Sequence, residues 1–142
     1  MSALLRLQNV SRRYGGLKAV DDVSFEVAPS EIVGLIGPNG AGKTTLMNLI
    51  SGVTPLSAGE ITLDGTRIDG LPPHRVARMG VARTFQVMRP FPGLSVRENV
   101  AIGARFGCRD NEGGIAAAIG RADAALERAG LGPRGAPPGS GR

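Results

Sequence analysis

The chain has 142 residues, a mass of 14.6 kDa and a formal net charge of +5. Its 42% hydrophobic and 20% charged residues are typical of a globular protein and exclude a disordered one. No stretch approaches the roughly 20 apolar residues that span a bilayer, and the N-terminus lacks the pattern of a signal peptide. The single cysteine, Cys108, excludes an internal disulfide and a multi-cysteine zinc site, so we expect a soluble domain in a reducing compartment.

The positive charge lies in the second half of the chain. Residues 1–71 carry 6 basic and 7 acidic side chains, whereas residues 72–142 carry 11 arginines and 5 acidic side chains. A nucleic-acid surface combines a basic stripe with stacking aromatics, but these arginines are spaced apart and aromatic residues are only 4% of the chain. We therefore predict no nucleic-acid partner and expect the arginines on a solvated or acidic-partner-facing surface.

Three strands are predicted before residue 37. Residues 4–10 form a short apolar-rich run, and residues 22–27 alternate apolar and polar side chains, as a half-buried strand does. Pro29 breaks the chain, and the continuous apolar run 32–36 follows. This run predicts a central strand that is buried on both faces of a parallel sheet.

A helix and a hairpin are predicted next. The residues after the apolar run have a helical pattern that ends at Gly52. Residues 59–63 and 66–68 are predicted strands, joined by the Asp64-Gly65 dipeptide of tight hairpin turns. We further expect a short helix over residues 73–79, stopped by Gly80, and a strand over residues 81–85.

Two more helices are predicted before a tail of different composition. Ser95 and Glu98 have the spacing of a capping box, so a helix should begin there. A second, amphipathic helix should end at Gly130, and its apolar stripe consists of Ile115, Ile119, Ala122, Leu126 and Ala129. Residues 132–142 are Gly, Pro, Arg and Ala apart from Ser140, so we expect this tail to be disordered.

The clearest motif is a phosphate loop. Residues 37–44, GPNGAGKT, fit the pattern G-x-x-x-x-G-K-[ST] without a mismatch, which chance would produce in roughly 0.5% of chains of this composition. The loop lies between a predicted buried strand and a predicted helix, which is the context that the motif requires. The predicted phosphate-contacting residues are Gly37, Pro38, Asn39, Gly40, Ala41, Gly42, Lys43, Thr44 and Thr45.

The residue types in this loop suit a nucleotide triphosphate. Glycines let successive backbone N–H groups converge on a phosphate, and the helix N-terminus adds its positive dipole end. Lys43 can reach the β- and γ-phosphates, the Thr44 hydroxyl can ligate Mg²⁺, and Thr45 can donate to the α-phosphate. The sequence contains no N-K-x-D string, which argues against a GTP-binding protein.

The string from Tyr14 to Asn99 resembles the ATP-binding subunit of an ABC transporter, of the importer type for branched-chain amino acids. The likeness covers most of the chain and stops near Gly130. It rests on YGGLKAV at residues 14–20, EIVGLI at 31–36 leading into the phosphate loop, LPPH at 71–74, ARMG at 77–80 and VARTFQ at 81–86. The last of these strings is a version of the glutamine loop of that subfamily.

The resemblance implies an α/β fold. It predicts the P-loop NTPase core of an ABC nucleotide-binding domain with an N-terminal antiparallel β portion, C-terminally truncated. The implied domain, a partial ABC-type ATP-binding domain, occupies residues 1–131, and residues 132–142 form the tail.

The resemblance also assigns roles to single residues. It implies that Tyr14 stacks on the adenine ring and that Val20 lines the adenine and ribose. Gln86 matches the glutamine that contacts the metal and the attacking water, so the candidate Mg²⁺ ligands are Thr44 and Gln86. The candidate catalytic residues are Lys43 and Gln86.

The resemblance implies partners and a location as well. Residues 89–98 match the segment that faces the coupling helix of a membrane subunit. We expect ATP and Mg²⁺ as cofactors, and as partners the membrane subunits, a second ATP-binding subunit and, indirectly, a periplasmic or extracellular solute-binding protein. The subunit would be cytoplasmic and peripheral on the inner face of the plasma membrane.

Three alternatives stay open at this point. The chain could serve another ABC transport substrate, such as lipopolysaccharide for export or urea and other amides. It could be a non-catalytic nucleotide-binding protein, or a soluble DNA-repair ATPase. The RTFQ string at residues 83–86 favours the amino-acid importer.

Several motifs of such an ATPase do not occur in the sequence. These are the acidic strand that holds Mg²⁺ and precedes a glutamate base, the LSGGQ signature and the switch histidine. Whether the chain is an enzyme is therefore left open, and we expect the 142 residues alone to fold poorly and to hydrolyse no ATP. A tail of Gly, Pro, Arg and Ala is what a G+C-rich gene encodes out of frame, so we hypothesise a chain cut short by a frameshift or a fragmentary gene near Gly130.

Overall fold

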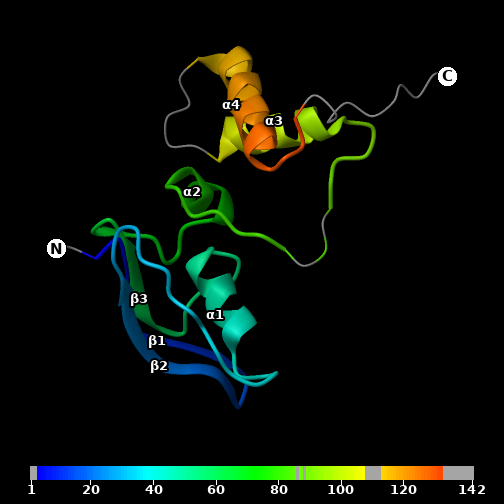
Figure 1. Ribbon diagram of the computed structural model, residues 1–142. Helices are drawn as coiled ribbons and strands as arrows, with labels where there is room; N and C mark the ends of the chain where they lie inside the picture. The colour runs from blue at the N-terminus through cyan, green and yellow to red at the C-terminus, as the bar shows by residue number, and fades with distance from the viewer. Residues whose placement is uncertain (1–2, 86, 88, 108–112, 133–142) are drawn as a thin grey trace. The chain divides into compact units, whose positions relative to one another are not determined.

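The computed structural model of the chain describes residues 3–85, 87, 89–107 and 113–132 (Figure 1). The chain divides into two compact units, an N-terminal unit over Met1–Val76 and a C-terminal unit over Ala77–Arg142. The predictions for Gln86, for Cys108 and for tail residues 133–142 lie outside the described residues. Within the described ranges, no helix is both long enough and apolar enough to cross a membrane.

The N-terminal unit is built on a four-stranded antiparallel sheet. Strands β1 (Leu5–Tyr14) and β2 (Leu17–Val27) form a hairpin, β3 (Ala58–Leu63) pairs with the other edge of β1, and β4 (Thr66–Arg67) pairs with β3. The strand order is β2-β1-β3-β4. This sheet confirms the predicted N-terminal antiparallel β portion and the predicted strands 4–10, 22–27 and 59–63. Strands β1 and β2 extend beyond the apolar patterns over residues 4–10 and 22–27 that predicted them.

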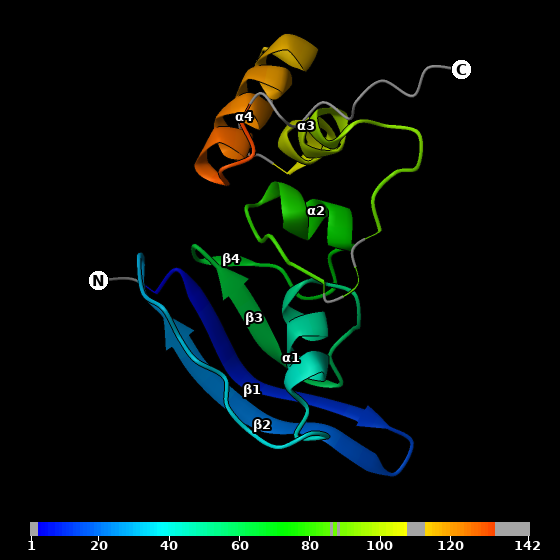
Figure 2. The same ribbon diagram turned by 45° about the vertical axis from the view of Figure 1, so that its right-hand side comes forward.

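Helix α1 (Lys43–Ile50) lies along one face of this sheet (Figure 2). The helix buries one apolar stripe, and the sheet offers a matching apolar face, so each removes the other from water. Gly52 follows the helix with a φ of 72°, the left-handed conformation that glycine adopts most easily after a helix end. The buried side chains of this core include Leu7, Val10, Leu46, Leu49, Ile50, Ile61 and Leu63.

The pairing of β1 with β2 shifts register three times, and at two of these shifts a polar residue has a positive φ. Asn9 (φ 49°) lies where the pairing shifts on β1, Asp22 (φ 53°) lies where it shifts on β2, and Asn9 Nδ2 donates to Asp22 Oδ1 at 2.8 Å. One extra residue reverses the alternation of a strand. As a result Val10 and Arg12 continue the core face of β1, and Arg12 lies opposite Val20.

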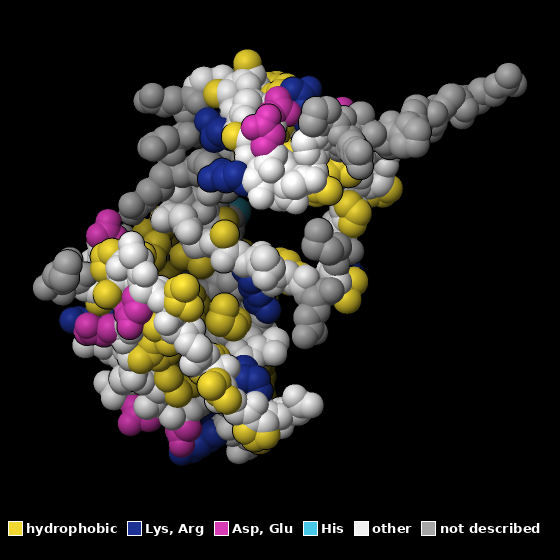
Figure 3. Space-filling model, in the orientation of Figure 1, with side chains coloured by type: hydrophobic (Ala, Val, Ile, Leu, Met, Phe, Trp, Pro, Cys, Tyr) yellow, Lys and Arg dark blue, Asp and Glu magenta, His cyan; other side chains and the backbone are white. Residues whose placement is uncertain are grey.

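The prediction of a buried strand over residues 32–36 is wrong for this structure. The segment between β2 and α1 contains no strand, and the side chains of Ile32 and Ile36 are 98% and 94% exposed. A strand needs neighbours for its backbone N–H and C=O groups, and none of the described strands pairs with this segment. Figure 3 shows apolar side chains on the surface of the N-terminal unit, and the exposed large ones there include Leu17, Ile32, Val33, Leu35, Ile36 and Val53.

The next predicted elements are confirmed in part. Asp64 and Gly65 join β3 to β4 with φ angles of 49° and 72°, as a tight hairpin turn requires. Helix α2 (Pro73–Arg78) is followed by Gly80 with a φ of 104°. The predicted strand over residues 81–85 is wrong, because this segment is irregular and pairs with no described strand.

The C-terminal unit consists mainly of α3 (Val96–Phe106) and α4 (Gly114–Arg128), which pack against one another. The predicted capping box is confirmed, because the Ser95 side chain accepts from the Glu98 N–H and the Glu98 side chain accepts from the Ser95 N–H. Arg97 Nε donates to Asp123 Oδ1 at 2.6 Å and joins the two helices.

The predicted apolar stripe of α4 is confirmed at Ala122 and Leu126 and is wrong at Ile115 and Ala129. Ala118, Ala122 and Leu126 are its buried residues, whereas Ile115 is 74% exposed and Ala129 lies beyond the helix end. Two of these three buried residues are alanines, which let another helix approach closely, so small residues rather than the large Ile115 mark the packed face. The helix ends as predicted before Gly130, which has a φ of 71°.

Candidate nucleotide-binding site

The phosphate loop connects the irregular segment 28–36 to the first turn of α1. Gly40 and Gly42 have φ angles of 85° and 82°, and the Ala41 N–H donates to the Pro38 carbonyl oxygen at 3.2 Å. Gly42 is the N-cap of α1, and no side chain in the described part of the chain caps the first N–H groups of this helix. The loop therefore curls so that a helix N-terminus with free donors follows directly, an arrangement that suits an anion.

The Lys43 ammonium folds back over this loop. Lys43 Nζ donates to the carbonyl oxygens of Gly37 and Pro38 at 2.5 and 2.6 Å. A lysine ammonium has three donors, so these two bonds fix its position and leave one direction for a further acceptor. The positive charge is thereby held beside the N–H groups of the loop, where a phosphate oxygen would gain both a charge and a hydrogen bond.

The loop packs closely against strand β2. A Cβ at Gly42 would overlap the carbonyl oxygen of Ala19 and would lie 3.5 Å from Val20 Cγ2. Only a residue without a side chain fits here, which gives the second glycine of the motif a packing reason besides its φ angle. Val20, which the resemblance assigns to the adenine and ribose, is 6% exposed and lies next to the loop.

Tyr14 lies at the end of β1, on the hairpin that carries Val20. Its side chain is 45% exposed, and the guanidinium carbon of Arg12 lies 4.5 Å from the centre of its ring. This is a cation–π distance, so one face of the ring is covered by charge. The predicted adenine platform is accessible, and Arg12 is a neighbour that the motif reading missed. The signal for it was its position two residues before Tyr14, on the same face of a strand.

The other predicted residues are placed as follows. Thr44 is exposed and Thr45 is half-buried in the first turn of α1, and Gln86 is not among the described residues. The described residues contain no group of three or more His, Cys, Asp or Glu side chains that could hold a metal ion. The predicted Mg²⁺ ligand Thr44 offers a single hydroxyl oxygen, and proteins usually hold Mg²⁺ by few side chains together with phosphate oxygens and water.

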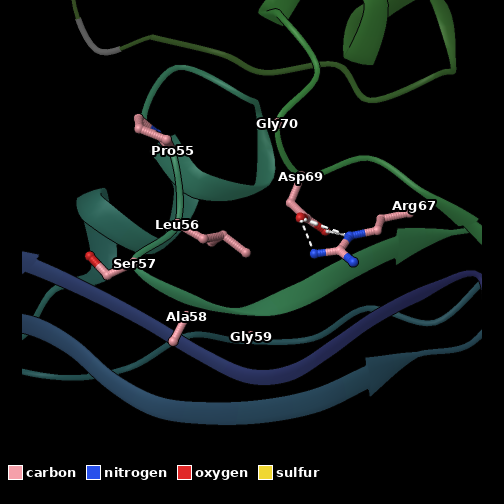
Figure 4. Close-up of a pocket in the computed structure, with 8 residues that line it drawn as sticks. All are labelled: Pro55, Leu56, Ser57, Ala58, Gly59, Arg67, Asp69 and Gly70. Atoms are coloured by element: carbon pink, nitrogen blue, oxygen red, sulfur yellow. Dashed lines mark hydrogen bonds and ion pairs between the residues drawn. The ribbon is translucent and has the colours of Figure 1, made fainter.

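A shallow depression of about 270 Å³ lies elsewhere on the N-terminal unit, and none of the predicted site residues lines it. Its lining residues are Pro55, Leu56, Ser57, Ala58, Gly59, Arg67, Asp69 and Gly70 (Figure 4). Arg67 and Asp69 point toward one another, with NH2 of Arg67 2.9 Å from Oδ2 of Asp69. Asp69 Oδ1 also accepts from the Ile61 N–H at 2.8 Å, so both charged groups already have partners and we assign them to the sheet's stability.

The charge state of Asp69 follows from these contacts. Burial alone would raise the pKa of its carboxyl, because the side chain is only 10% exposed. The hydrogen bonds from Arg67 and Ile61, together with the Arg67 charge, outweigh this effect and hold the pKa below its usual value. Asp69 is therefore a carboxylate in the folded chain at neutral pH.

The Asn99 side chain holds the segment before α3 through several hydrogen bonds. Asn99 Oδ1 accepts from the Phe91 N–H at 2.8 Å, and its Nδ2 donates to the carbonyl oxygens of Leu94 and Ser95 at 3.2 and 3.0 Å. Phe91 is 55% exposed and Leu94 is 41% exposed on this loop. The loop thus presents apolar side chains on a fixed backbone. It lies within the segment 89–98, which the resemblance predicts to face a membrane subunit.

A family profile described as ABC transporter matches residues 20–138, more than half of the chain. The chain therefore belongs to the ABC transporter family. The match includes the phosphate loop and the segment before α3, and the predicted fold class, the nucleotide-binding domain of that family, is confirmed.

Several relatives that match this chain are ATP-binding proteins of amino acid and polyamine transport. The chain is 48% identical over 99 residues to the high-affinity branched-chain amino acid transport ATP-binding protein LivG of Escherichia coli K12, covering 70% of this chain and 39% of that protein. The corresponding protein BraF of Pseudomonas aeruginosa is 44% identical over the same length. A spermidine/putrescine import ATP-binding protein, PotA of Nitrosospira multiformis, is 43% identical and is covered to 26%. The chain spans about two-fifths of the length of LivG.

Solved structures agree with this assignment. The ADP conformation of an ATP-binding cassette of an ABC transporter superposes with a TM-score of 0.75 at 29% identity, over 92% of this chain and 55% of that one. A dimeric post-hydrolysis state of another ATP-binding cassette, bound to ADP and Pi, gives a TM-score of 0.72 at 27% identity, over 93% of this chain and 60% of that one.

Proposed function

We propose that the chain is the ATP-binding part of an ABC importer for branched-chain amino acids. The observation that carries the proposal is the loop that ends at Gly42 and Lys43, where a curled backbone, a helix N-terminus and a held ammonium meet. The substrate class rests on the 48% identity to a protein named for branched-chain amino acid transport. Export of lipopolysaccharide, transport of urea or amides, and a purely regulatory nucleotide site have less support, because two of the three relatives above are named for branched-chain amino acids.

In this proposal the phosphates of ATP bind to the N–H groups of residues 37–45. Lys43 exchanges its bonds to the Gly37 and Pro38 carbonyls for the β- and γ-phosphates, which offer stronger, charged acceptors. Thr44 supplies a hydroxyl to Mg²⁺, which when bound neutralises the charge of the phosphates. We assign phosphate binding to these residues and assign no general base to the described part of the chain.

The base of the nucleotide is proposed to lie on Tyr14. Tyr14 is 45% exposed and Arg12 lies over one face of its ring, and a stacked base is worth about 1–3 kcal/mol in proteins that bind single nucleic-acid strands. Val20 would line the adenine and ribose from the strand beside the loop. Gln86 stays a proposed contact to the metal and the attacking water.

The proposed partners are the membrane subunits of the importer and a second ATP-binding subunit. The loop fixed by Asn99 supports the first, because Phe91 and Leu94 offer apolar contacts on a backbone that needs no further ordering. The dimeric cassette among the structural neighbours supports the second. The chain would then work on the inner face of the plasma membrane, with a solute-binding protein on the other side.

Uptake of a labelled amino acid tests the proposed function. Deletion of the gene in its own host should abolish high-affinity uptake of radiolabelled leucine and leave uptake of spermidine unchanged. The wild-type gene should restore leucine uptake, and a copy with Lys43→Ala should not. Unchanged leucine uptake in the deletion strain would exclude the proposed substrate class, and loss of spermidine uptake alone would assign the chain to polyamine import.

A further inference from the structure

Arg12 is held from two sides at the end of the β1–β2 hairpin. Its guanidinium carbon lies 4.5 Å from the centre of the Tyr14 ring, and its NH1 donates to the Pro55 carbonyl oxygen at 3.0 Å. Its Nε is buried and has no hydrogen-bond partner among the described residues. The position of the guanidinium therefore depends on the ring on one side and on the segment after α1 on the other.

This position follows from the pairing of the hairpin. Arg12 and Tyr14 are two residues apart on β1, so they lie on the same face of the strand. Arg12 also pairs directly with Val20, whose side chain lies beside Gly42 of the phosphate loop. One arginine thus contacts the ring that the base would stack on and faces the residue that would line it.

We propose that Arg12 is a positioning residue for the base of the nucleotide. The guanidinium covers one face of the Tyr14 ring and leaves the opposite face for a flat aromatic base, and the bond to the Pro55 carbonyl oxygen holds the guanidinium in this position. The proposal rests on the proposed nucleotide binding. It predicts that Arg12 contributes to the affinity for ATP and not to the affinity for a triphosphate without a base.

The test compares two ligands and two neighbouring arginines. Isothermal titration of the full chain with ATP and with inorganic tripolyphosphate, each with Mg²⁺, gives the affinity with and without the base. The variants are Arg12→Met and Arg13→Met. Both remove one positive charge, but Arg13 is exposed and is not the arginine that stacks on Tyr14.

Arg12→Met should weaken ATP binding about three- to tenfold, the range that one cation–π or stacking contact supplies, and should leave tripolyphosphate binding unchanged. Arg13→Met should change neither. Equal losses of affinity for ATP and for tripolyphosphate would show that Arg12 has a purely structural role and would overturn the proposal. Unchanged ATP binding in Arg12→Met would overturn it too, while the proposed function would stand.

Two further results distinguish failure of the Arg12 proposal from unfolding of the variant and from failure of the proposed nucleotide site. If Arg12→Met unfolds, as shown by far-UV circular dichroism, Arg12→Lys carries the comparison, because it keeps the charge and loses the planar fork that reaches Pro55. Arg12→Lys should then show a partial loss for ATP alone, and wild-type affinity for ATP would contradict the role of the fork. Wild-type chain that is folded by far-UV circular dichroism and binds neither ligand would exclude the proposed nucleotide site, and the role of Arg12 with it.

Discussion

Gly42 leaves no room for a side chain beside the carbonyl oxygen of Ala19. A Cβ at this position would overlap that oxygen, and the φ of 82° at Gly42 is itself unfavourable for any residue with a side chain. The contact joins the phosphate loop to strand β2 at the point where α1 begins. The shape of the proposed site therefore depends on the sheet as much as on the loop.

Gly42→Ala should destabilise the N-terminal unit more than Gly40→Ala. Both glycines have a positive φ, which costs an alanine about 1–2 kcal/mol, but a Cβ at Gly40 would meet nothing within 4 Å. The overlap with Ala19 adds to the cost only at Gly42. Urea titration monitored by the fluorescence of Tyr14 measures the free energy of unfolding of each variant. Tyr14 can serve as the probe because it is the only tyrosine and the sequence has no tryptophan. Equal destabilisation by the two substitutions would contradict the close packing.

Asp69 should make the stability of the N-terminal unit depend on pH. Because its pKa is lowered in the folded state, its contribution is present above the unfolded pKa and is lost as the pH falls through the folded pKa. Asp69→Asn keeps an acceptor for the Ile61 N–H but loses the charge that pairs with Arg67. The difference in urea midpoint between wild type and Asp69→Asn should thus be largest near pH 7 and shrink toward about pH 3. A difference that is the same at both pH values would be inconsistent with this linkage.

Asn99→Ala should release the loop before α3. The substitution removes an acceptor from the Phe91 N–H and a donor from the Leu94 and Ser95 carbonyls, while the helix itself can form. Hydrogen exchange at the Phe91 amide should rise by about tenfold or more, since a hydrogen bond contributes about 1 kcal/mol and several are lost. The Leu131 amide, which donates to the Leu126 carbonyl, serves as the internal control. Unchanged protection at Phe91 would show that Asn99 does not hold the loop.

The exposed run 32–36 should make the isolated chain self-associate. Ile32 and Ile36 are almost fully exposed on a segment that pairs with none of the described strands, and such apolar segments pair with other chains. Ile36→Lys should raise the fraction of monomer in sedimentation velocity. Leu17→Lys, the same change at a residue that is 67% exposed on β2, should have a smaller effect. A wild-type chain that stays monomeric at high concentration would rule this expectation out.

The sequence predicts local features of this fold better than it predicts long-range pairing. Three predicted features depend on residues within a few positions of one another, and all three are confirmed. They are the capping box at Ser95, the turn at Asp64-Gly65 and the helix that begins at Lys43. The strands predicted over residues 32–36 and 81–85 depend on partners elsewhere in space, and hydrophobicity alone does not provide those partners.

The candidate site shows the same division. The phosphate loop can be predicted from its sequence motif, because each residue type in the motif is required by the local backbone conformation. The stack of Arg12 on Tyr14 depends on strand alternation, and the overlap at Gly42 depends on where the backbone of β2 passes. Neither is part of a motif, although the spacing of Arg12 and Tyr14 on a predicted strand would have placed them on one face.

Equilibrium binding of ATP to lysine variants tests the proposed site most directly. The chain has only two lysines, Lys43 in the loop and Lys18 on β2, where it pairs with Asp21 at 2.8 Å. Isothermal titration with ATP and Mg²⁺ should show saturable binding to wild type and to Lys18→Ala. Lys43→Ala should bind at least about tenfold more weakly, since hydrogen bonds to charged groups contribute about 1.5–3 kcal/mol. Equal affinity of wild type and Lys43→Ala for ATP would contradict the assignment of this loop to the phosphates.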